Sequence, residues 1–204
     1  MSLAFSSGGV VMWPLLISSI TSITCIIERF LYWNSIKWHN RNTFNKILNN
    51  FKNDPDHINE YLLRNSKSPL SFVLLEALNY QSSSSEFFHF ALTCSLKSII
   101  PHFRRFDDIF STIITLSPLL GLLGTIIGLI KSFSLIDIGK IGVNSQGVTS
   151  GISEALVSTA AGLIVAIFTL IFANYFRSMS NHQISLIQEY TAKIELINSE
   201  RKYL

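Results

Sequence analysis

Three windows with almost no charge constrain this chain of 204 residues more than any other feature. They are residues 10–27, 110–130 and 152–173, and each is about as long as a helix that crosses a bilayer. Charged residues make up only 14% of the chain, against about a quarter of a soluble domain. So short a chain has too little polar sequence to cover three such helices in water. The windows therefore predict an all-α integral membrane protein with three transmembrane helices.

The placement of Lys and Arg predicts how the chain is oriented, because short cytoplasmic segments of membrane proteins are enriched in positive charge. Residues 28–109 carry ten Lys and Arg side chains and residues 174–204 carry four, whereas residues 131–151 carry two and residues 1–9 carry none. We therefore expect the first two of these segments in the cytoplasm and the other two outside it. The net charge of +3 follows from this topology, and we expect no nucleic-acid partner.

Apolar residues recur at helical spacing in both segments that we expect in the cytoplasm. The stretches NTFNKILNNF and INEYLLRN show this spacing in the long segment, where Pro101 can kink the last helix. Residues 175–201 show it in the tail, which extends the third transmembrane helix. No pattern indicates strands, internal repeats or a separate soluble domain. The predicted fold is three transmembrane helices extended into a cytoplasmic helical bundle.

Small and hydroxylated residues recur every seven positions in the second window, which places them on one face of a helix. They are Ser111, Pro118, Thr125 and Ser132, and beside them lie Gly121, Gly124 and Gly128. In lipid, small residues let helices approach closely, and hydroxyl groups can hydrogen-bond across the contact. The face is typical of a seam between packed helices, with the threonine hydroxyl bonded to its own backbone. The alternative is that it lines a narrow path through the membrane.

A carboxylate interrupts the third window. Glu154 is the one residue inside the three windows with a side chain that carries a charge at neutral pH. It lies one turn before Ser158, with Thr159 to the side and Gly162 among the small residues that follow. Ionisable groups within a membrane usually face protein or a water-filled cavity. This favours a proton pathway along Glu154, Ser158 and Thr159.

The alternative explanation of Glu154 is structural. The residue lies near the outer end of its window, where its carboxylate could reach water. It could also form an ion pair with Lys131 or Lys140 across the short turn.

Enzyme function has little support in the sequence. The five His residues are scattered without metal-ligand spacing. No HExxH, nucleophile-elbow or Walker A pattern is present, and GLLGTIIG lacks the Lys that a phosphate-binding loop needs. We expect no catalytic site, no metal and no cofactor.

The membrane segments resemble the MotA/TolQ/ExbB proton-channel family, and most of all its ExbB and TolQ branches. The resemblance covers about half of the chain and is weak in the long cytoplasmic segment. It is carried by GGVVMWPLL and IERF in the first helix, by SPLLGLLGTIIGLIKSF in the second and by GISEALVSTAAGLIVAIF in the third.

The resemblance implies a homo-oligomeric ring, typically a pentamer, in the bacterial inner membrane, with residues 1–9 and 131–151 in the periplasm. Helices two and three would line a pore that holds the helices of a single-span partner like ExbD or TolR. Thr125 and Thr159 match the pore threonines of the family, and Glu154 matches its helix-three Glu. The main proton-carrying carboxylate would be an Asp on the partner, and Glu154 would be an accessory.

The implied function is that of an energiser subunit, with protons as the transported ion. The ring would use the proton-motive force to drive an effector like TonB or TolA, in import across the outer membrane or in envelope integrity. One departure from the family is Phe168, which stands where ExbB and TolQ usually have a Pro, so a straighter third helix is expected. The alternatives are a subunit like a flagellar stator, a branch that typically has four spans, and a non-conducting membrane scaffold.

Overall fold

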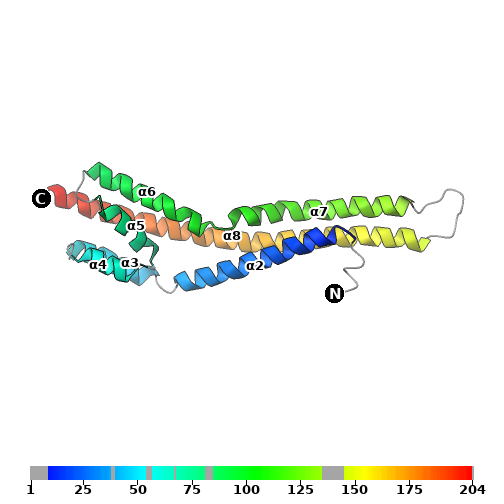
Figure 1. The fold of residues 1–204 in the computed structure, drawn as a ribbon, viewed down its shortest axis with the longest axis horizontal. Helices are drawn as coiled ribbons and strands as arrows, with labels where there is room; N and C mark the ends of the chain where they lie inside the picture. The colour runs from blue at the N-terminus through cyan, green and yellow to red at the C-terminus, as the bar shows by residue number, and fades with distance from the viewer. Residues whose placement is uncertain are drawn as a thin grey trace. The chain divides into compact units, whose positions relative to one another are not determined.

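The computed structural model describes residues 9–37, 40–53, 57–66, 68–80, 85–134 and 145–203, and the elements in these ranges are all α-helices, as predicted (Figure 1). The helices are α2 (Met12–Lys37), α3 (Asn40–Asn53), α4 (Ile58–Arg64), α5 (Pro69–Leu78), α6 (Ser85–Phe103), α7 (Asp107–Ser134) and α8 (Ser145–Tyr203).

The chain divides into two compact units, each made of segments that are distant in the sequence. The first unit comprises residues 1–28 and 106–175, and so contains α7 with the first parts of α2 and α8. The second unit comprises residues 29–105 and 176–204, and contains α3 to α6 with the remaining parts of α2 and α8.

Three of the described helices, α2, α7 and α8, are long and apolar enough to cross a membrane. They contain the second and third predicted windows and all but the first two residues of the first, so the prediction of three candidate spans in an all-helical membrane protein is confirmed. Which side of the membrane each end faces stays a prediction.

The helix ends differ from the predicted boundaries. Helix α7 continues to Ser134 and α8 begins at Ser145, so both ends of the expected turn at 131–151 are helical. The middle of that turn, with Lys140, lies outside the described residues. Helix α8 is continuous through Phe168 to Tyr203, as expected for a tail that extends the third span without a Pro.

Neither proline within the later helices ends its helix. Pro118 lies inside α7, and Pro101 lies near the end of α6, which continues to Phe103. Residues 104–106 separate α6 from α7, and Phe106 among them has a φ of 70°, which is uncommon for a residue with a side chain.

The second unit has its own apolar core. Helix α3 is polar except on one face, where Phe44, Ile47 and Phe51 recur at intervals of three and four and are buried. The tail of α8 covers this face: the Tyr190 ring meets Phe44 edge-on at 5.3 Å between ring centres, and its hydroxyl lies 2.5 Å from the amide oxygen of Asn45. Burial of this face explains why a polar sequence forms a stable helix.

Helix α5 is the most buried helix of the second unit and packs against both α4 and α6. Its fully buried side chains are Leu70, Ser71, Val73, Leu74 and Ala77. Pro69 occupies the first position of the helix, where its fixed φ suits the helix and no backbone donor is lost.

The first unit depends on close packing of α7 against α8. The buried face of α7 includes Ser117, Gly121, Gly124, Gly128 and Ser132. The residues of α8 that meet it are Gly151, Ala155, Ser158, Thr159 and Gly162. We call this contact the α7–α8 seam.

Glycine is required in the seam because the two backbones nearly touch. A Cβ atom added to Gly162 would lie 2.5 Å from the carbonyl oxygen of Ser117, and one added to Gly121 would lie 3.0 Å from the Cα of Thr159. Both neighbours are backbone atoms, so no side-chain rotation could relieve the contacts. The glycines singled out in the sequence thus lie in a helix–helix contact of the kind that small residues permit in lipid.

The four residues that recur every seven positions along α7 do not share one environment. Ser111 is exposed, Pro118 and Thr125 are half-buried, and Ser132 is buried. An α-helix advances 3.6 residues per turn, so a seven-residue repeat drifts around the helix by about 20° each time. Over three repeats the set passes from the surface to the seam, and the expectation of a single shared face is wrong.

Replacing Leu74 with Ala tests the core of the second unit. Leu74 is fully buried, so Leu74→Ala should lower the stability by about 2–5 kcal/mol. The control is Leu63→Ala, because Leu63 is 62% exposed. Thermal unfolding in detergent, followed by circular dichroism, should show a lower midpoint for the first variant only. Equal midpoints would contradict this description of the core.

Adding one methyl group at Gly162 tests the seam. Gly162→Ala places a carbon against the Ser117 carbonyl oxygen, and overpacking of this kind costs about 1–3 kcal/mol. Ala160→Val adds two carbons at an exposed position of the same helix and should leave the unfolding midpoint of the detergent-solubilised chain almost unchanged. If the two variants unfold at the same temperature, the backbones are not in the close contact described.

Candidate functional site

The hydroxyl groups of α8 bond to the backbone of α7 in the middle of the seam. The Thr159 hydroxyl donates to the Gly121 carbonyl oxygen at 3.0 Å. The Ser158 hydroxyl lies 2.8 Å from the carbonyl oxygen of Ala155 in its own helix and 3.4 Å from that of Gly121. The Gly121 carbonyl is within reach of these hydroxyls because the residue has no side chain between the helices.

Thr125 does not take part in this contact. Its hydroxyl donates to the Leu122 carbonyl oxygen of its own helix at 2.6 Å, as the packing interpretation of the sequence predicted. The residue of α7 that Ser158 and Thr159 meet is instead Gly121, one turn before Thr125. Both Thr125 and Thr159 are half-buried, so they lie at the edges of the seam rather than inside it.

A threonine that donates its proton can still accept a hydrogen bond, because the hydroxyl oxygen has two lone pairs. Thr125 and Thr159 each donate to a carbonyl oxygen. Their oxygens therefore present acceptors, at half-buried positions, to water or to an acidic group from another helix. Ser158, in contrast, is fully buried within the chain.

Glu154 forms an ion pair at the end of the seam. Its Oε2 atom lies 3.0 Å from the Nζ atom of Lys131 in the last turn of α7. The Glu154 side chain is 15% exposed, whereas that of Lys131 is 62% exposed. The ion pair with Lys131, one of the structural explanations of Glu154 that the sequence left open, is therefore present in the structure.

The other carboxylate oxygen of Glu154 lies against Gly9. A Cβ atom built on Gly9 would be only 2.2 Å from Oε1, and Gly9 has a φ of +69°, which favours glycine independently. Sequence reasoning missed this contact. The two residues are far apart in the chain, and a Gly-Gly pair by itself indicates only a turn.

A buried hydroxyl pair joins α2 to α8. The hydroxyl oxygens of Ser22 and Thr169 lie 2.7 Å apart, and Thr169 also donates to the Val165 carbonyl oxygen at 2.7 Å. Both side chains are buried. Sequence reasoning missed this pair as well, although hydroxyl groups inside apolar windows were a signal that could have pointed to it.

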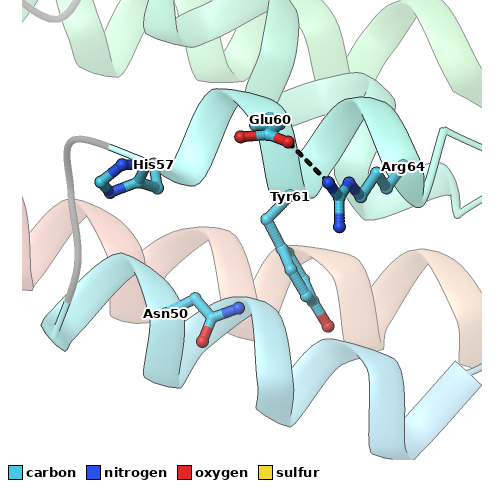
Figure 2. A pocket seen from close by; sticks show the side chains of 5 residues that line it. All are labelled: Asn50, His57, Glu60, Tyr61 and Arg64. Atoms are coloured by element: carbon cyan, nitrogen blue, oxygen red, sulfur yellow. Dashed lines mark hydrogen bonds and ion pairs between the residues drawn. The ribbon is translucent and has the colours of Figure 1, made fainter.

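The second unit contains a shallow polar pocket that the sequence did not predict. Its volume is about 240 Å³, and Figure 2 shows its lining residues, Asn50 from α3, His57, and Glu60, Tyr61 and Arg64 from α4. Arg64 and Glu60 pair at 2.7 Å, but their side chains are 76% and 62% exposed. The pair is therefore well solvated, and such pairs contribute little energy.

Metal binding has no support in the part of the chain that the structure describes. No three His, Cys, Asp or Glu side chains there lie close enough together to hold a metal ion. The candidate site is the seam, because the hydroxyl groups and the ion pair inside the candidate spans lie along it, with Thr125 and Thr159 at its edges and the Lys131–Glu154 pair at its end.

Comparison with known proteins identifies the family of this chain. The model of the MotA/TolQ/ExbB proton channel family matches residues 65–189. The biopolymer transport protein ExbB-like 3 of Synechocystis sp. is 44% identical over 192 residues, which are 94% of this chain and 91% of that protein. ExbB of Neisseria gonorrhoeae is 30% identical over an alignment of 197 positions that covers 86% of this chain and 86% of that protein. The chain thus belongs to the MotA/TolQ/ExbB proton channel family and is most similar to its ExbB branch.

Proposed function

We propose that this chain is the channel subunit of a proton-driven energiser that works with a single-span partner like ExbD or TolR. The observation that carries the proposal is the polar set on α7 and α8 inside two candidate spans of a chain from a proton-channel family. Thr125, Thr159 and Glu154 are half-buried in this chain. A neighbouring subunit or a partner helix can therefore still reach them.

The proposed chemistry places the proton carrier on the partner. An Asp in the partner's single span would pick up a proton, and the Thr159 oxygen would accept a hydrogen bond from the neutral acid. The Gly121 carbonyl holds the Thr159 hydroxyl in one orientation, which directs its lone pairs. Glu154 would be an accessory that sets the local charge.

The energy source would be the proton-motive force. One charge that crosses the membrane gains about 2.3 kcal/mol per 100 mV of potential. A homo-oligomeric ring, with a pentamer as the expected form, would convert this energy into movement of the partner and of an effector like TonB or TolA. The relatives are named for biopolymer transport, and the process driven would be import across the outer membrane or envelope integrity.

The proposed location is the bacterial inner membrane, with the amino terminus in the periplasm and the carboxyl terminus in the cytoplasm. The Lys and Arg distribution supports this orientation. It would place the Lys131–Glu154 end of the seam toward the periplasm, and the second unit, with its polar pocket, in the cytoplasm.

A non-conducting scaffold is the second candidate, and one observation favours it. Ser158, Thr159 and Thr125 all donate to backbone carbonyls within the chain. These bonds would satisfy the hydroxyl groups in lipid even if no proton ever passed.

Removing the Thr159 hydroxyl separates the two candidates. In liposomes that contain the chain and its partner, Thr159→Val should lower the proton flux by about two- to tenfold, since a hydrogen bond between neutral groups is worth about 0.5–1.5 kcal/mol. Thr159→Ser keeps the hydroxyl and should retain most of the flux. Glu154→Ala should lower the flux less than Thr159→Val does.

The assembly of each variant must be measured alongside the flux, by size-exclusion chromatography with the partner. A Thr159→Val complex that assembles and conducts like the wild type would refute the pathway and leave the scaffold. Loss of assembly in Thr159→Val together with normal flux in Thr159→Ser would assign the hydroxyl a packing role.

A further inference from the structure

Three separate segments of the first unit enclose the Glu154 carboxylate. Helix α8 carries it, Lys131 of α7 contacts one oxygen at 3.0 Å, and Gly9, just before α2, lies against the other. A sequence separation of 23 residues divides Lys131 from Glu154, so helix folding alone does not bring the two together.

The exposures assign different roles to the two charged side chains. The carboxylate is largely covered, with 15% of the Glu154 side chain exposed, and a covered charge is costly unless it is paired. Lys131 is 62% exposed, so its long side chain reaches the carboxylate without being covered itself. The ion pair therefore stabilises the covered carboxylate of Glu154 more than it stabilises the exposed ammonium group of Lys131.

Gly9 provides the space for this arrangement. With a Cβ at position 9, the atom would lie 2.2 Å from Oε1 of Glu154, and the carboxylate would have to move. The Met12 amide donates to the Gly9 carbonyl oxygen at 3.2 Å, so the backbone of Gly9 is joined to the first turn of α2. The carboxylate is thus confined on one side by a backbone and on the other by a cation.

We propose that Lys131 is the positioning residue of Glu154: with Gly9 it holds the side chain in one place at the end of the seam, as one half of an ion pair. The proposal rests on the proposed function, because it assigns Glu154 its part in the channel. Removing the Lys131 ammonium group leaves a covered carboxylate without its cation, which is costly.

Labelling with a hydrophobic carbodiimide tests this proposal, because the reagent reacts with protonated carboxylic acids and not with carboxylates. The full chain with its partner in liposomes is treated at neutral pH, and the modified fraction of Glu154 is measured by mass spectrometry. Lys131→Met should raise that fraction about fivefold or more, the factor that corresponds to about 1 kcal/mol. Lys131→Arg keeps the cation and should label like the wild type. Asp108, exposed in the first turn of α7, is the internal reference and should not change.

Equal labelling of Glu154 in the wild type and in Lys131→Met would overturn the proposal, and so would strong labelling of the wild type itself. If Lys131→Met fails to assemble, the exchange Lys131→Glu with Glu154→Lys decides instead. It should restore assembly if the two side chains act as a pair, and its failure to do so would count against the proposal.

The test does not depend on proton flux. A wild-type complex that conducts no protons would refute the proposed function, while the labelling would still report whether Lys131 controls Glu154. Normal flux with unchanged labelling would refute only the positioning role.

Discussion

The near-contact of the α7 and α8 backbones at Gly121 and Gly162 is the constraint on which the rest of the first unit depends. Because no side chain separates the helices there, the Thr159 hydroxyl of one helix reaches the Gly121 carbonyl of the other. The same approach brings Glu154 near the last turn of α7, where Lys131 meets it. A proton path along the seam would thus depend on these glycines, although they have no side chain that could bind a proton. In lipid, where apolar surfaces gain little from meeting each other, such packing is a main source of helix association.

Much of the fold could be predicted from the sequence, because a helix that crosses a bilayer needs a certain length and an apolar composition, and both can be recognised in the sequence alone. The three windows, the helical long segment and the unbroken tail of α8 were all predictable. The seam was predictable only in part. Seven-residue spacing placed Ser111 and Ser132 on one face, but the drift of a real helix separates them, with one exposed and the other buried. Helix ends were also missed, since residues 131–134 and 145–151 of the expected turn are helical.

The contacts around Glu154 show why site geometry was harder to predict than fold. Lys131 could be named as a partner because it stood at the other side of a short turn. Gly9 could not, because its contact depends on where the start of α2 meets α8 in space. The Ser22–Thr169 pair has the same character: each hydroxyl was visible in its window, but their 2.7 Å contact depends on the packing of two helices distant in the sequence.

Proton flux into liposomes under an imposed membrane potential tests the central claim most directly. The chain alone, a single-span partner with an Asp in its span, and the two together would be compared at equal protein density. The account predicts proton flux that requires both proteins and increases with the potential. Vesicles that contain the assembled complex but conduct no more than vesicles with either protein alone would contradict it.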